Sequence, residues 1–136
     1  QCLNIYKGNE FFFVSVNGKA ITDDFINIMD RREKPFVVFD NLMEPLPELD
    51  VLYMTRVQRE RFFNEQDYIR LKDSYILTPE KMALAKADMA VLHPLPRVNE
   101  ISVQVDKDPR ACYFKQVLNG KYMRMALILK LLEVTV

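Results

Sequence analysis

The sequence predicts an α/β fold, a Rossmann-like parallel sheet with helices on both faces. Short apolar runs rich in aromatic and β-branched residues, typical of strands buried on both faces, alternate with segments of helical spacing. The chain has 136 residues and 49% of them are apolar, which is enough for one domain with its own core. Because no Ser/Gly linker or fixed-period repeat interrupts the chain, we expect no internal domain boundary.

The strands of this sheet are expected where short apolar runs end at turn-forming residues. Four segments fit: Phe11–Val16, Phe36–Phe39, Val51–Thr55 and Ala90–Leu92. A fifth segment, Tyr75–Leu77, is expected to be extended or to form a brief strand. Strands separated by helices imply βαβ crossovers and therefore parallel pairing. In such sheets, ligands bind beyond the carboxyl ends of the strands.

The helices are expected between and after these strands, at Asp23–Arg31, Asp67–Lys72, Thr78 to about Lys86, Asp108–Leu118 and Tyr122–Glu133. Thr78-Pro79-Glu80 favours a helix start, with proline at the first helical position and an acid in the first turn. Pro45 and Pro47 allow at most a helical turn or two within Asn41–Glu48. Gly120 is expected to separate the last two helices. The final helix is apolar almost all round, so we expect its burial on more than one side.

Composition excludes several functional classes. With 19 basic and 19 acidic residues, the chain has no global electrostatic case for binding nucleic acid or a membrane surface. The longest apolar run, Met125–Leu129, is too short to span a bilayer, and the first residues do not form a signal peptide. Since no initiator methionine precedes Gln1, we expect the chain to begin within a longer protein. Cys2 and Cys112 are interpreted as free thiols in a reducing cytoplasm rather than as a disulfide.

The segment after the third expected strand is rich in arginine, with Arg56, Arg59 and Arg61 within six residues. A guanidinium grips a carboxylate or phosphate through two parallel hydrogen bonds. Arg56, followed by Gln58, is therefore a candidate ligand for one carboxylate of a small diacid. The alternative is a solvated charged turn in which Glu60 pairs weakly with a neighbouring arginine.

The segment after the fourth strand is His93-Pro94-Leu95-Pro96-Arg97. Its two prolines fix φ, remove two backbone donors and leave carbonyls available to accept hydrogen bonds from a ligand ammonium. The Leu95–Pro96 bond is our candidate for a cis peptide. The alternative is a rigid loop that ends the sheet, with His93 hydrogen-bonded beneath it. No second histidine supports a His-based metal site.

Other chemistries find little support in the sequence. The three glycines form no phosphate-binding loop, and no nucleophile elbow or paired-carboxylate signature is present. The acidic pairs Asp23-Asp24 and Asp106-Lys107-Asp108 are interpreted as helix-start residues rather than as a metal site.

The arginine-rich segment after the third expected strand and the His93–Arg97 segment after the fourth resemble the aspartate carbamoyltransferase family. The resemblance runs in order from about Gly8 to the end and rests on Val51–Phe62, Val91–Ile101, Val105–Ala111, Tyr113-Phe114, Asn119-Gly120, Arg124 and Met125–Leu127. Two long motifs at the right separation make it specific. The related ornithine enzymes differ at both places and carry a cysteine in the second loop.

The resemblance implies a reaction and a set of ligands. The family transfers a carbamoyl group from carbamoyl phosphate to the amine of L-aspartate, the committed step of pyrimidine synthesis. By position, Arg56 and Gln58 are expected to bind the aspartate carboxylates. The carbonyls of Pro94 and Leu95 are expected to hold the substrate amine and the carbamoyl group, and Leu95–Pro96 matches the family's cis peptide.

Three further residues are expected to act on the conformation of the enzyme. Arg61 resembles the arginine that stabilises the closed enzyme by interdomain pairing, and Arg97 and Glu100 resemble loop-ordering residues. The family uses orientation and electrostatics, so the resemblance implies no cofactor, no metal and no covalent intermediate. It assigns no catalytic residue to this chain.

The departures from the family are as informative. The carbamoyl-phosphate motif Ser-Thr-Arg-Thr-Arg, the His-Pro-Thr-Gln motif with the family's catalytic histidine, and the first strand with its Gly-Arg-Thr segment are absent from the sequence. Gln1–Lys7 is expected to enter partway through the helix after that strand. Residues 1–136 are therefore expected to be a partial aspartate-binding domain without the carbamoyl-phosphate-binding domain.

Such a chain is expected to be inactive alone. Its implied partners are L-aspartate, the carbamoyl-phosphate-binding half against which the last helix packs, and a catalytic trimer to which regulatory chains can attach. The alternative is a noncatalytic domain, derived from the family, that binds a small dicarboxylate or a partner protein.

Overall fold

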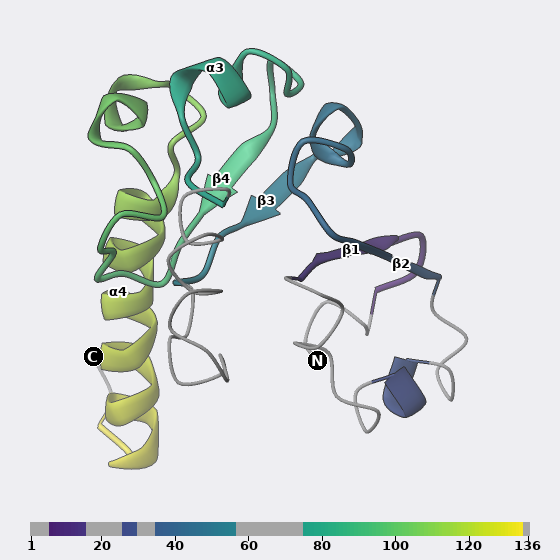
Figure 1. The fold of residues 1–136 in the computed structure, drawn as a ribbon. Helices are drawn as coiled ribbons and strands as arrows, with labels where there is room; N and C mark the ends of the chain where they lie inside the picture. Colours follow the sequence, from purple (N-terminus) through teal and green to yellow (C-terminus); the bar gives the residue numbers. More distant parts are fainter. Residues whose placement is uncertain (1–5, 16–25, 30–34, 57–74, 135–136) are drawn as a thin grey trace, which may run out of the picture. The chain divides into compact units, whose positions relative to one another are not determined.

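The computed structural model describes residues 6–15, 26–29, 35–56 and 75–134, which belong to two compact units (Figure 1). The first unit draws on Gln1–Pro47 and Gln58–Tyr75, and the second on Glu48–Val57 and Ile76–Val136. The sequence contains no linker that would have marked a boundary between them. The helix expected at Asp67–Lys72 lies outside the described residues.

The first unit contains a pair of parallel strands. β1 (Phe11–Val14) pairs with β2 (Phe36–Phe39) in the register Phe11 to Phe36 (Figure 1). Aromatic rings reinforce the pair, since the rings of Phe12 and Phe39 meet edge to face with centroids 5.4 Å apart. Residues 26–29 are helical, within the range expected for the first helix, and Met29 is buried.

The second unit also contains parallel strands. β3 (Val51–Tyr53) pairs with β4 (Ala90–Leu92), so that Tyr53 stands opposite Leu92. On the other edge of β4, Val91 forms a parallel bridge with Ala111. Leu77 forms only an isolated parallel bridge with Ile101. Of the two expectations for Tyr75–Leu77, an extended segment or a brief strand, the structure therefore favours the extended segment. The parallel pairing confirms the α/β class.

The core of the second unit lies around β3 and β4. Its buried apolar side chains come from both strands and from the segments that follow them: Leu52, Met54, Leu77, Met82, Met89, Val91, Ile101, Val105 and Tyr113. Burial of these side chains is the main favourable term that holds the strands together.

Helix α3 (Pro79–Met82) starts where the sequence predicts and ends earlier. The Thr78 hydroxyl caps it by accepting from the Lys81 N–H at 3.4 Å, and Pro79 occupies the first turn. The helix stops at Met82 rather than near Lys86. Leu46–Glu48 forms one 3₁₀ turn, which agrees with the expectation of at most a turn or two.

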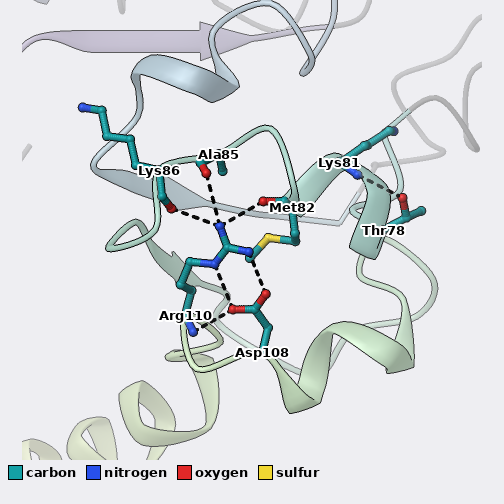
Figure 2. Close-up of polar contacts among 7 residues, drawn as sticks. All are labelled: Thr78, Lys81, Met82, Ala85, Lys86, Asp108 and Arg110. Carbon is teal, nitrogen blue, oxygen red and sulfur yellow. Dashed lines mark hydrogen bonds and ion pairs between the residues drawn. The ribbon is translucent and has the colours of Figure 1, made fainter.

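An arginine from a distant segment donates hydrogen bonds to carbonyls at and after the end of α3 (Figure 2). Arg110 donates from Nη1 to the carbonyls of Met82 at 2.9 Å and Lys86 at 3.0 Å, and more weakly to that of Ala85 at 3.4 Å. Its Nε and Nη2 hold the Asp108 carboxylate at 2.9 and 2.7 Å. The hydrogen bond from Arg110 lowers the pKa of Asp108. This cluster, which we call the Arg110 clamp, gives the carbonyls at and just after the end of the helix a charged hydrogen-bond donor.

The helix predicted at Asp108–Leu118 is wrong at its start. Val103–Lys107 forms a 3₁₀ helix (η5), and Asp108 then accepts the Arg110 N–H at 2.9 Å around Pro109, which is an Asx turn. Helix α4 begins only at Tyr113 and runs to Leu131 without a break (Figure 1).

The break expected at Gly120 is also wrong. Gly120 lies inside α4, where glycine costs roughly 1 kcal/mol relative to alanine. That cost is too small to end a 19-residue helix with good helix formers on both sides. The two helices predicted at this end of the chain are therefore one.

Most of the large apolar side chains of α4 are exposed in the second unit. The set comprises Phe114, Val117, Leu118, Tyr122, Met123, Met125, Leu127, Ile128 and Leu131. Within the second unit, the expected burial of this helix on more than one side is therefore not met. No helix in the described part of the chain is both long and apolar enough to cross a membrane.

Candidate functional site

The two segments singled out in the sequence follow neighbouring strands. Tyr53 stands opposite Leu92, so Arg56 and Leu95 each come three residues after a paired position. The Met54 N–H continues the ladder by donating to the Leu92 carbonyl at 2.8 Å. Parallel strands bring their carboxyl ends to one edge, and that edge is where α/β proteins bind ligands. Arg56 is exposed there, whereas Gln58 and Arg61 lie outside the described residues.

The loop after β4 has the backbone that its two prolines suggested. The Leu95–Pro96 peptide is cis, which confirms the prediction. Leu95 has a φ of 47°, in the left-handed region that few residues other than glycine adopt. Pro94 is exposed and Leu95 half-buried.

His93 lies buried beneath this loop, at 1% exposure. Its Nδ1 accepts the Leu95 N–H at 2.9 Å, and its Nε2 lies 2.9 Å from Oε1 of the equally buried Glu100. The alternative in which His93 is hydrogen-bonded beneath a rigid loop therefore describes its contacts correctly.

The Glu100 carboxylate accepts hydrogen bonds from the turn that follows the loop. Its Oε2 accepts the N–H groups of Val98 and Asn99, both at 3.0 Å. Burial raises the pKa of Glu100, but hydrogen bonds from backbone N–H groups and from His93 outweigh it and hold that pKa below its usual value. The carboxyl is thus ionised at neutral pH although it is buried.

Arg97 holds the far side of the loop. It grips Asp106 with both terminal nitrogens, one of them at 2.6 Å, and Tyr113 donates its hydroxyl to the same carboxylate. The hydrogen bond with Asp106 raises the pKa of Arg97 and lowers that of Asp106. Burial, followed by the hydrogen bond to Asp106, raises the pKa of Tyr113 to about 12. A bidentate pair of this kind fixes the arginine in direction as well as in place.

The interpretation of the two aspartates as helix-start acids holds for Asp106, which lies in the first turn of η5, and is wrong for Asp108, which follows the end of η5. Both form ion pairs, Asp106 with Arg97 of the loop and Asp108 with Arg110. The Asp108-Pro109-Arg110 spacing is a local signal that could have revealed the second pair. Asp106 and Arg97 are nine residues apart, and nothing local in the sequence marks that pair.

Sequence reasoning did not single out Gln116. This side chain of α4 accepts the His93 N–H at 2.9 Å through Oε1 and lies 3.4 Å from the Tyr53 hydroxyl through Nε2. It also lines a pocket of about 250 Å³ with Leu92, Cys112, Lys115 and Asn119. Cys112 is a free thiol, as expected, whereas Cys2 lies outside the described residues.

Taken together, the fold and these side chains define the ligand-binding part of an α/β protein. An exposed arginine and a loop with two prolines follow adjacent parallel strands at the edge of the sheet where α/β proteins bind ligands. Residues 5–131 match the model of the aspartate/ornithine carbamoyltransferase family, Asp/Orn binding domain. The chain belongs to this family.

Relatives from bacteria align with almost the whole chain. The aspartate carbamoyltransferase catalytic subunit of Clostridium botulinum (strain Hall) is 56% identical over 135 residues, which cover 98% of this chain and 44% of that protein. The corresponding subunit of Finegoldia magna is 54% identical over 134 residues, with the same coverage. The chain thus spans less than half the length of these relatives.

Solved structures show the same architecture. The catalytic subunit of M. jannaschii aspartate transcarbamoylase matches with a TM-score of 0.87 and 36% identity, covering 96% of this chain and 42% of that one. Aspartate transcarbamoylase from Trypanosoma cruzi, in complex with N-(phosphonacetyl)-L-aspartic acid, matches with a TM-score of 0.77 and 33% identity. That match covers 88% of this chain and 39% of the other.

Proposed function

We propose that this chain is the aspartate-binding part of an aspartate carbamoyltransferase, which transfers the carbamoyl group of carbamoyl phosphate to the amine of L-aspartate. One observation carries the proposal. In a chain of this family, Arg56 and the loop of Pro94 and Leu95 follow the carboxyl ends of two adjacent strands that pair in register. A cation for carboxylates and acceptors for an amine then lie at the same edge.

The chemistry of each group suits one part of aspartate. The Arg56 guanidinium binds one carboxylate through paired hydrogen bonds, and Gln58 donates to a carboxylate from its amide. The carbonyl oxygens of Pro94 and Leu95 accept hydrogen bonds from the substrate amine and the carbamoyl group. Arg97 and Glu100 keep the loop in shape through their contacts with Asp106, Val98 and Asn99.

The carbamoyl-phosphate-binding half supplies the rest of the proposed enzyme. Arg61 pairs across the two halves, and the exposed apolar side chains of α4 pack against the other half. The similar aspartate transcarbamoylase from Trypanosoma cruzi has been solved in complex with carbamoyl phosphate and aspartate, which supports these two substrates. The complete enzyme would work in the cytoplasm as a catalytic trimer, with or without regulatory chains.

A titration of the purified chain tests the proposal, with backbone amide shifts as the measurement. L-aspartate, succinate and N-(phosphonacetyl)-L-aspartate are the three ligands. We expect L-aspartate to shift Thr55–Gln58 and His93–Arg97, with affinity in the millimolar range or weaker because part of the ligand set is elsewhere, which corresponds to roughly 4 kcal/mol or less. Succinate lacks the amine, so it should shift the arginine segment and leave the loop unchanged.

Arg56→Lys is the matched control, because it keeps the charge and removes the fork that binds a carboxylate. It should weaken the response to L-aspartate and to succinate alike. A folded chain whose amides do not shift with L-aspartate would count against an aspartate site. Binding of dicarboxylates without any response in the loop would favour the noncatalytic alternative.

A further inference from the structure

We propose that His93 is a positioning residue, which aims the Pro94 carbonyl at the substrate by holding the Leu95 N–H with its Nδ1. The inference deepens the proposed function and rests on it in one respect, since Pro94 and Leu95 are taken as substrate ligands. Neither the sequence nor the family comparison assigns His93 a role in binding.

The hydrogen bonds determine which ring nitrogen carries the proton. Nδ1 lies 2.9 Å from the Leu95 backbone nitrogen, which can only donate, so Nδ1 is the acceptor and carries no proton. Nε2 lies 2.9 Å from Glu100 Oε1 and donates to that carboxylate. His93 is therefore the neutral tautomer with its proton on Nε2.

The same hydrogen bond orients a substrate-facing carbonyl. Pro94 and Pro96 have no N–H, so Leu95 provides the one backbone donor within these three residues. The Leu95 N–H shares a planar trans peptide with the Pro94 carbonyl, and in such a unit the two groups point in opposite directions. A Leu95 N–H directed inward to the buried ring therefore points the Pro94 oxygen outward.

The backbone conformation of Leu95 makes the hydrogen bond from its N–H to His93 Nδ1 necessary. Leu95 has a φ of 47°, which a branched side chain adopts only where its surroundings fix it. Without the Nδ1 acceptor, the Leu95 N–H would lose its hydrogen-bond partner in a partly buried position, and the peptide would be released to rotate.

His93 is itself held from two elements, so it can act as a fixed point. Its backbone N–H donates to Gln116 Oε1 at 2.9 Å, which ties it to α4. Its ring is tied through Glu100 to the turn at Val98 and Asn99. The ring is 1% exposed and has no room to turn over without losing both ring contacts.

A first measurement needs no ligand. His93 is the single histidine of the chain, so its ring nitrogens give NMR signals without assignment. In the isotope-labelled chain at neutral pH, we expect a proton on Nε2 and none on Nδ1. A proton on Nδ1, or on both nitrogens, would overturn the inference whatever the chain's function is.

A second measurement separates positioning from folding with two variants of opposite design. An asparagine at this position would place its amide oxygen near the site of Nδ1, whereas the longer glutamine would place its amide near the site of Nε2. His93→Asn thus keeps the acceptor for Leu95 and loses the donor to Glu100. His93→Gln does the reverse. Both are made in a complete enzyme, formed by joining this chain to the N-terminal part of the Clostridium botulinum relative.

We expect His93→Gln to raise the KM for aspartate about tenfold, the equivalent of one lost buried hydrogen bond. The KM for carbamoyl phosphate should change less, because its phosphate ligands lie in the other half. His93→Asn should keep the KM for aspartate within about threefold although it melts at a lower temperature, since Glu100 loses a partner. If KM follows the melting temperature in both variants, His93 is merely structural and the inference fails.

The two proposals fail in different ways. An unsubstituted joined enzyme that folds without carbamoyltransferase activity would count against the proposed function. The protonation of the His93 ring would still decide the inference about the loop, since that measurement does not depend on activity.

Discussion

Among the described residues, pairing distinguishes the arginines of the fold from the candidate ligand arginine, Arg56. Arg97 and Arg110 each hold one aspartate with two hydrogen bonds and are largely buried, with side-chain exposures of 16% and 15%. Guanidiniums saturated in this way are structural. Arg56 is exposed at the carboxyl edge of β3, where a carboxylate of a ligand could reach it.

The Arg110 clamp gives a prediction at this scale. Arg110→Lys keeps the charge, but a single ammonium cannot hold Asp108 and the carbonyls of Met82 and Lys86 together. We expect the free energy of unfolding to fall by about 2 kcal/mol, since hydrogen bonds to a charged group are lost. Urea denaturation followed by circular dichroism measures it.

Lys86→Gln is the control for the clamp. It removes the ion pair of Lys86 with Asp50, whose side chain is 86% exposed, and leaves the Lys86 carbonyl in place. An exposed pair contributes little, so the change should stay within about 0.5 kcal/mol. Equal losses in the two variants would mean that Arg110 is no more than another surface charge.

At the scale of elements, the sequence predicted what local chemistry determines. β2 and β4 have the expected bounds, because continuous apolar runs favour strands. The expected burial on both faces is not met in β2, where Val37 and Val38 are exposed among the described residues. The start of α3 was predicted from its own cap, Thr78. Its end was not, because the residue that donates to the carbonyls of Met82 and Lys86, Arg110, comes 24 to 28 positions later.

The unbroken α4 gives the prediction for this scale. A Cβ at Gly120 would come no closer than 3.5 Å to another group, the Arg124 guanidinium, which is an ordinary contact. Gly120→Ala should therefore raise the free energy of unfolding of this chain by about 0.5–1 kcal/mol. The reverse change at an exposed position of the same helix, Ala126→Gly, should lower it by a similar amount. A destabilised Gly120→Ala chain would show that this glycine is needed for more than helix geometry.

At the scale of the molecule, part of the candidate site could be located from the sequence because ligands bind beyond the carboxyl ends of parallel strands. Applied to the apolar runs of the sequence, that rule pointed to Arg56 and to the loop at Pro94 and Leu95. That rule did not identify the residues that hold the loop in place. Gln116 reaches His93 across 23 positions, and such a contact forms only when α4 is packed beside β4.

The exposed apolar side chains of α4 and the absent phosphate motif lead to one prediction about activity. Electrostatic stabilisation of the departing phosphate typically lowers a barrier by several kcal/mol, about 3 or more, and no segment of this chain resembles the family's phosphate site. We expect the purified chain to produce no carbamoyl-aspartate. We also expect it to self-associate through α4, which light scattering measures.

Mixing the chain with the N-terminal half of the Clostridium botulinum relative should restore activity and reduce self-association. The double variant Leu127→Lys, Leu131→Lys should remain monomeric and fail to restore activity, because charges in the contact cannot be buried. Robust carbamoyl transfer by the chain alone would refute the division of labour between the two halves.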